Sequence, residues 1–112
     1  MNGTRLAAIG VMATAAIALA APAQADDYDY IFKQTVNRFG VYGGQDYLAW
    51  LGKITCDRLG RGVDHDAYQS ANFIQKNLPR GTTQGQALQF LGASVDHYCP
   101  DKVGVVQAAG TP

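Results

Sequence analysis

The chain has 112 residues, which is enough for one small domain. Lys and Arg number 9 and Asp and Glu also number 9, so the formal net charge is zero, which argues against nucleic acid or an acidic membrane as an electrostatic partner. The 2 cysteines are too few for a four-thiolate zinc site. The composition contains no catalytic fingerprint, and we expect neither a cofactor nor a metal. Function therefore has to be approached through compartment, architecture and surface.

The first 25 residues are typical of a secretory signal peptide. Arg5 supplies the positive charge, residues 6–21 form an uncharged run rich in Ala, and residues 23–25 (Ala-Gln-Ala) fit the cleavage pattern. The mature chain is then expected to begin at Asp26. The alternative, an uncleaved membrane anchor, is disfavoured because a span needs roughly 20 strongly apolar residues. We therefore expect a secreted or cell-envelope protein without a stable membrane span after cleavage.

Removal of 25 residues from 112 leaves 87 residues, with 8 basic and 9 acidic side chains and a net charge of −1. A domain of this size has a thin core and commonly needs a covalent staple. Cys56 and Cys99 are the two cysteines, and an oxidising compartment permits a disulfide between them. Closing this loop contributes on the order of 4 kcal/mol of stability. The alternative, a pair of free redox thiols, has little support because Cys-x-x-Cys spacing is absent.

Helix signals recur four times along the chain, and no strand pattern persists. The first three helices are expected at Asp27 to Phe39, Asp46 to Leu59 and His65 to Leu78. Asp64 is expected to cap the third helix. The fourth helix opens with a capping box formed by Thr83 and Gln86, and Pro100 closes it.

Residues 103–112 are small and uncharged, and they show no helical period. We therefore predict a helical domain over residues 26–102 and a flexible tail over residues 103–112. The chain contains no internal repeats.

The predicted fold class is all-α, a small four-helix bundle stapled by the Cys56–Cys99 disulfide. The two cysteines lie near the C-terminal ends of the second and fourth helices, so a disulfide predicts that these helices run parallel. Packed helix axes usually lie 8–10 Å apart, which is wide for a disulfide. We therefore expect Gly52 and Gly92 to allow close approach of the two helices, the alternative being that these glycines are incidental.

Two polar clusters are candidates for chemistry. Asp64, His65 and Asp66 could bind a metal or form a base and its orienting carboxylate, but adjacent residues at a helix start point in different directions. The competing interpretation is a helix cap with acids at the positive end of the dipole. Asp96 and His97 lie in the last turn of the fourth helix, where a His suits the helix C-terminus. No catalytic or metal-binding residue is assigned from these clusters.

The aromatic side chains are more informative. At 100° per residue, Trp50 points nearly opposite the main apolar stripe of the second helix, and Tyr47 and Ile54 flank it. Phe73 and Phe90 likewise lie off the main stripes of their helices, as does Tyr30. Exposed aromatic patches commonly mark interaction sites. The predicted binding residues are Tyr47, Trp50, Ile54, Phe73 and Phe90. The alternative is that the helices are short and wrapped, or that the second is buried all round.

The chain resembles a group of small secreted mycobacterial proteins classed as a domain of unknown function. The resemblance rests on Cys56-Asp57-Arg58-Leu59-Gly60-x-Gly62, on Thr83 with Gln86-Ala87, and on the closing Tyr98-Cys99-Pro100. It implies a helical fold and a disulfide between the two cysteines. Since that family has no established activity, the resemblance implies no catalytic residue.

The predicted function is a secreted helical binding module, with a protein or a small apolar ligand as its partner and no nucleic-acid partner. One alternative is a structural component of the cell envelope without a ligand. The other is a small enzyme with His65 or His97 as its base, although the sequence favours a protein that is not an enzyme.

Overall fold

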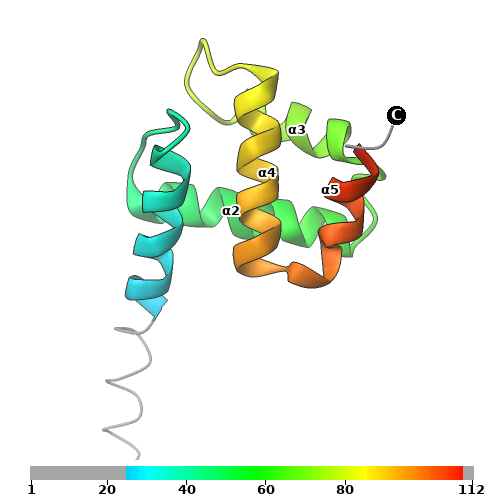
Figure 1. Cartoon of the computed structure of the whole chain (residues 1–112), viewed down its shortest axis with the longest axis horizontal. Helices are drawn as coiled ribbons and strands as arrows, with labels where there is room; N and C mark the ends of the chain where they lie inside the picture. Colours follow the sequence, from blue (N-terminus) through cyan, green and yellow to red (C-terminus); the bar gives the residue numbers. More distant parts are fainter. Residues whose placement is uncertain (1–24, 110–112) are drawn as a thin grey trace, which may run out of the picture.

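The computed structural model describes residues 25–109, and in this range the chain is helical, without strands (Figure 1). The described part of the N-terminal helix covers residues 25–37. It is followed by α2 (Gln45–Gly60), α3 (Ala67–Lys76), α4 (Gln84–Tyr98), a short 3₁₀ turn η1 (Pro100–Lys102) and α5 (Val103–Ala109). The predicted all-α class is confirmed. Apart from residue 25, the predicted signal peptide lies outside the described residues.

The helix boundaries follow from local capping. The capping box of α4 forms as predicted, because Thr83 Oγ1 accepts from the N–H of Gln86 at 3.0 Å while the Gln86 side chain accepts from the N–H of Thr83 at 2.9 Å. The cap of α3 is Asp66, whose carboxylate accepts from the N–H of Gln69 at 2.9 Å. The prediction of Asp64 as this cap is therefore wrong.

The core is built around α4, which packs against α2, α3 and α5. Its largest fully buried side chains come from four helices: Phe32, Phe90, Leu48, Leu51, Ile74, Leu91, Val36 and Val95. Figure 1 shows α4 crossing in front of α2 at a steep angle. At least these two helices therefore enclose the core by crossing each other rather than by packing as aligned bundle helices.

The disulfide between Cys56 and Cys99 is confirmed, with the two Cα atoms 5.9 Å apart. The prediction that the second and fourth helices run parallel is wrong, since α2 and α4 cross (Figure 1). One covalent link fixes the distance between two points but leaves the direction of each helix to side-chain packing. The number of helices also exceeds the predicted four, because α5 is an additional helix.

The two glycines expected at the close approach behave differently. A Cβ on Gly52 would lie 2.9 Å from Cζ of Phe32 and 3.0 Å from Cε2 of Tyr98, so this position has no room for a side chain. A Cβ on Gly92 would meet no atom within 4 Å. The predicted role is thus retained for Gly52, where α2 meets Tyr98 of α4 and Phe32 of the N-terminal helix, and is wrong for Gly92.

Residues 103–109, predicted as the start of a flexible tail, instead form α5, which contacts both α3 and α4. Val105, Val106 and Ala109 pack against the core. The prediction failed because so short a segment shows little periodicity, although these three small apolar residues suffice to cover the core. Residues 110–112 lie outside the described range.

Candidate functional site: an aromatic seam between α2 and α3

Trp50 lies on the outer side of α2, as its helical position predicts. The inner side of α2 buries Leu48, Leu51 and Leu59, whereas Trp50 is 48% exposed and its neighbour Tyr47 is 46% exposed. The two rings lie 5.6 Å apart between centroids, within the range of an aromatic pair. Two large rings are therefore held together at the surface.

This pair continues into a seam where α2 borders α3. The hydroxyl of Tyr47 donates to the carbonyl of Asn77, just past the end of α3. Further along α2, the guanidinium of Arg58 lies 4.0 Å from the centroid of the Phe73 ring on α3. Ile54 lies one turn after Trp50 on α2 and is partly buried, as is Phe73. We call Tyr47, Trp50, Ile54 and Phe73 the aromatic seam.

Phe90, the fifth predicted binding residue, does not belong to this surface. It is fully buried and packs edge-on against Phe32, with ring centroids 5.4 Å apart. The stripe arithmetic assumed one buried side for each helix, but α4 has neighbours on several sides and buries more than one stripe. Phe90 is a core residue, so its assignment as a binding residue is wrong.

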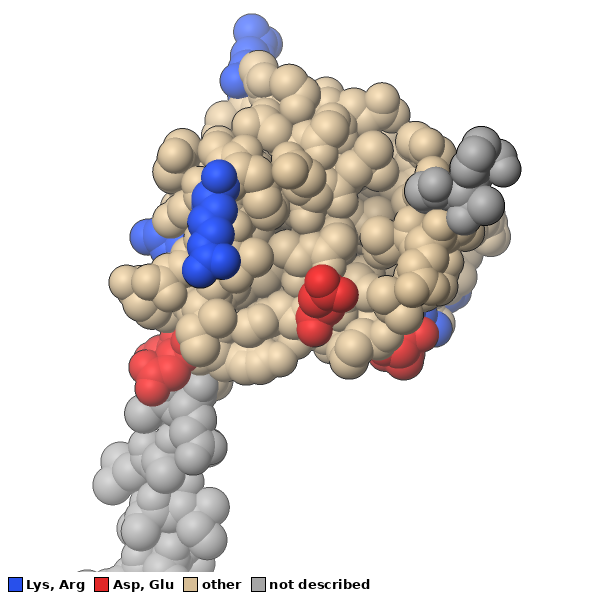
Figure 2. Space-filling view, viewed as in Figure 1, with Lys and Arg blue, Asp and Glu red and all other residues tan. Residues whose placement is uncertain are grey.

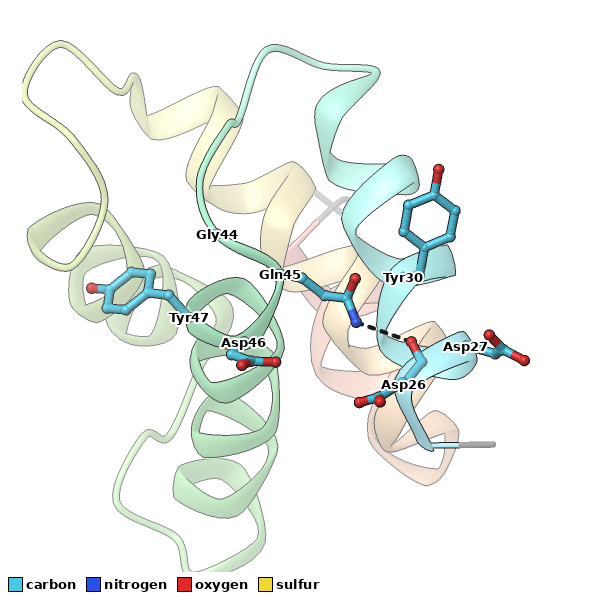
Figure 3. Close-up of a pocket in the computed structure, with 7 residues that line it drawn as sticks. All are labelled: Asp26, Asp27, Tyr30, Gly44, Gln45, Asp46 and Tyr47. Atoms are coloured by element: carbon cyan, nitrogen blue, oxygen red, sulfur yellow. Dashed lines mark hydrogen bonds between the residues drawn. The ribbon is translucent and has the colours of Figure 1, made fainter. Parts of the chain in front are cut away.

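An open groove of about 640 Å³ adjoins the Tyr47 end of the seam, where the N-terminal helix meets the start of α2. Figure 3 shows Gln45 reaching from α2 to the N-terminal helix, where its amide donates to the carbonyl of Asp26 at 3.0 Å. The acidic residues that line the groove are Asp26, Asp27 and Asp46, and no basic residue lines it. The rings of Tyr30 and Tyr47 point away from each other (Figure 3), so the groove does not enclose a ligand between them.

The predicted cluster of Asp64, His65 and Asp66 does not converge. Asp64 is buried and accepts from Nε and Nη2 of Arg58 at 3.0 and 2.9 Å, and from the hydroxyl of Ser70 at 3.1 Å. The hydrogen bonds from Arg58 to Asp64 raise the pKa of Arg58. Asp66 caps α3, and His65 is exposed. Within residues 25–109 there is no group of three or more His, Cys, Asp or Glu side chains placed to hold a metal.

His97 is part of a second aromatic group, which joins the N-terminal helix to the end of α4. Its Nε2 lies 2.7 Å from the carbonyl of Tyr28, and the hydroxyl of Tyr28 donates to the carbonyl of His97. Both rings also approach closely, with centroids 3.8 Å apart. The hydroxyl of Tyr28 and Nε2 of His97 therefore both hold the N-terminal helix against α4, which is a structural role.

Tyr98 completes this group. Its hydroxyl donates to Asp29 at 2.7 Å, and Lys53 of α2 binds the other oxygen of the same carboxylate at 3.2 Å. Burial, followed by the hydrogen bond to Asp29, raises the pKa of Tyr98 far above its ordinary value. We call Tyr28, Asp29, Phe32, His97 and Tyr98 the aromatic clasp.

Sequence reasoning missed the clasp and the burial of Asp64. Tyr28, Asp29 and Phe32 do share one helical face, which is a signal for a common partner. The partner, at the far end of the chain, could not be read from this spacing. The pairing of Asp64 with Arg58 arises from the turn between α2 and α3, which reverses the chain between them.

The comparisons with known proteins place the chain in a family. Residues 25–101 match the family model described as a protein of unknown function, DUF732. The chain belongs to the DUF732 family. It is 68% identical over 111 residues to the uncharacterized proteins Rv0559c and MT0585 of Mycobacterium tuberculosis strains H37Rv and CDC 1551, and the match covers 99% of each chain. No solved structure matches this chain. The resemblance to a mycobacterial family of unknown function is thereby confirmed.

The DUF732 domain presents little charge on the face seen in Figure 2. Lys, Arg and Asp side chains are scattered there among a predominantly uncharged surface. Among the helices of residues 25–109, none combines the length and apolar character needed to cross a bilayer.

Proposed function

We propose that this DUF732 chain is an exported binding module that recognises another protein through the aromatic seam. The observation that carries the proposal is the Tyr47–Trp50 pair, whose rings are each nearly half exposed and lie side by side on α2. Trp and Tyr are the residues most enriched where protein interfaces derive their binding energy. The chain holds these two rings in place but leaves them exposed, so a partner protein can bind by covering them.

A protein surface fits the seam better than a small apolar ligand. The neighbouring groove is open, and three carboxylates line it, so it offers a small apolar molecule neither enclosure nor an apolar lining. The enzyme alternative is also weakened, because His97 is engaged with Tyr28 in the clasp and the carboxylate of Asp64 is engaged with Arg58 and Ser70.

Export is the second part of the proposal. Residues 1–25 have the pattern of a signal peptide, and a disulfide such as Cys56–Cys99 persists in oxidising compartments rather than in the cytosol. The N-terminal sequence of the protein recovered from culture medium or cell envelope tests this part. We expect it to begin at Asp26, and recovery of only the full-length chain inside the cell would contradict export.

Binding is tested by thermal unfolding of the oxidised protein. The panel contains metal ions, lipid vesicles, small apolar ligands and fractions of exported mycobacterial proteins. A partner present at 100 times its dissociation constant raises the free energy of unfolding by about 2.7 kcal/mol, which is roughly 10 °C or more in Tm for a domain of this size. We expect a protein fraction to give this shift.

Matched variants locate the binding surface. Tyr47→Ala removes a ring from the seam, whereas Tyr42→Ala removes a ring that is 66% exposed in the loop before α2. We expect the partner to bind at least tenfold more weakly to the first variant and unchanged to the second. A partner that binds both variants equally uses another surface, and the proposed function is then wrong.

A further inference from the structure

The exposed side chains on the outer side of α2 are arranged so that this side is complementary to the same side of a second copy of the chain. Five side chains form the part of this outer face that is centred on Trp50: Asp46, Tyr47, Trp50, Lys53 and Ile54. At 3.6 residues per turn they lie within about 120° of the helix circumference, with Trp50 in the middle. Asp46 and Lys53 lie on one edge of the face, and Tyr47 and Ile54 lie on the other.

The spacing along the helix is balanced around Trp50. Asp46 comes four residues before Trp50 and Lys53 comes three residues after it, so their positions lie about 6 Å and about 4.5 Å from it along the axis. On the opposite edge, Tyr47 comes three residues before Trp50 and Ile54 four residues after. A two-fold axis beside Trp50 therefore exchanges each position with its counterpart on the same edge.

We propose that α2 docks against α2 of a second copy of this chain, antiparallel, with Trp50 at the two-fold axis. This inference rests on the proposed function, because it names the partner of the same surface. In this arrangement Asp46 of each copy faces Lys53 of the other, and Tyr47 of each copy faces Ile54 of the other. Each contact occurs twice, as an isologous interface requires.

The charges also select the direction of the pairing. A parallel two-fold pair in register would bring opposite edges of the face together, so that Asp46 faces Tyr47 and Lys53 faces Ile54 without a charge pair, whereas the antiparallel pair makes two attractive contacts. Lys53 is 53% exposed at its side chain, so its ammonium group can bind Asp29 of its own chain and still donate to a carboxylate of the second copy. The expected net charge of −1 on the mature chain adds little repulsion between copies.

The area of the face sets the expected affinity. Trp50 and Tyr47 are each about half exposed, and a buried aromatic side chain covers 150–250 Å², so the two rings contribute about 200 Å² per copy. Stable interfaces bury about 800 Å² per partner. We therefore expect a weak dimer that forms only at high protein concentration.

Sedimentation velocity of the exported, oxidised protein between 10 µM and 1 mM tests the inference. We expect monomers at the lowest concentration and mainly dimers at the highest. Trp50→Ala should weaken the dimer at least tenfold. Tyr68→Ala is the matched control, because Tyr68 is 51% exposed on α3 outside the seam, and it should leave the dimer unchanged.

Charge reversal separates paired docking from non-specific association. Asp46→Lys and Lys53→Asp should each abolish the dimer when alone, since like charges then face each other. An equimolar mixture of the two variants should form a heterodimer, because both pairs are attractive again. Variants that associate as the unchanged chain does, or a mixture that stays monomeric, would overturn the inference.

The outcome is distinguishable from a failure of the proposed function. A chain that stays monomeric at 1 mM excludes the second copy as the partner. Thermal stabilisation by an exported protein fraction, lost in Tyr47→Ala, would still support a binding module with a different protein partner. A dimer that is insensitive to Trp50→Ala would show that the copies meet through another surface, which also overturns the inference.

Discussion

The aromatic clasp and the aromatic seam are built from the same kinds of side chains, but the chain covers their central rings to different extents. In the clasp, the Tyr28 and Tyr98 hydroxyls have hydrogen-bond partners, and Phe32 is fully buried. In the seam, Trp50 has one ring neighbour and is nearly half exposed. Aromatic content alone therefore does not separate a core from an interaction surface. What separates Phe32 of the clasp from Trp50 of the seam is whether the chain itself covers the ring.

The largest expected difference between the two regions is in stability. Phe32→Ala removes a fully buried ring that contacts Phe90 and Tyr98, and it should lower the free energy of unfolding by about 3–5 kcal/mol. Urea unfolding of the oxidised protein measures this loss. A cost below about 1 kcal/mol would mean that the clasp contributes little to the fold.

The turn between α2 and α3 gives the next largest effect. Arg58→Ala leaves the buried carboxylate of Asp64 without its bidentate partner, and it should cost about 3 kcal/mol. The exposed pair of Arg61 and Asp57 is the control, since surface ion pairs contribute about 0–1 kcal/mol. Equal costs for Arg58→Ala and Arg61→Ala in urea unfolding would show that the burial of Asp64 does not matter.

Two glycine substitutions should change the free energy of unfolding in opposite directions. Gly52→Ala places a Cβ against Phe32 and Tyr98 and should destabilise the protein by about 1–3 kcal/mol. Gly92→Ala adds a Cβ in open space within a helix and should stabilise the protein by about 1 kcal/mol. Thermal unfolding of both variants side by side measures the sign. A stabilising Gly52→Ala would show that the clasp yields easily at this position.

Tyr98 gives the clasp a dependence on pH. Its pKa is raised in the folded state, so the unfolded chain loses the phenol proton near pH 10 while the folded chain keeps it. Stability from this group is therefore complete below pH 10 and is lost as the pH rises further. Urea unfolding between pH 8 and 11 should show this decline, and it should be smaller in Tyr98→Phe, which itself costs about 1–2 kcal/mol at neutral pH. An identical decline in both proteins would assign it to other groups.

The sequence predicted features that depend on one helix or on one covalent link. The capping box of Thr83 and Gln86 and the outward position of Trp50 follow from local spacing, and both are present. The disulfide followed from the small size of the domain and its expected compartment. Each of these predictions needs no knowledge of which helices become neighbours.

The predictions that failed required such knowledge. Phe90 was placed on a surface because its helix was assumed to bury one side, whereas α4 is covered on several sides. The prediction of Asp64 as a helix cap fails because the turn that carries Asp64 to Arg58 has no sequence signature of its own. The predicted flexible tail over residues 103–112 fails at residues 103–109, because three small apolar residues give too weak a helical period. Four of the five predicted binding residues, all except Phe90, lie in the aromatic seam. Their binding role stays a prediction.

The smallest effect on stability should come from the seam, and it is the one that bears most on function. Trp50→Ala removes a ring with few contacts inside the chain, so we expect the free energy of unfolding at low protein concentration to change by about 0.5 kcal/mol or less. The same substitution should weaken association at high concentration at least tenfold. Exposed aromatic side chains that gather in one patch commonly mark an interaction site. If Trp50→Ala instead costs as much as Phe32→Ala, the seam is part of the fold, and the contrast between the two regions disappears.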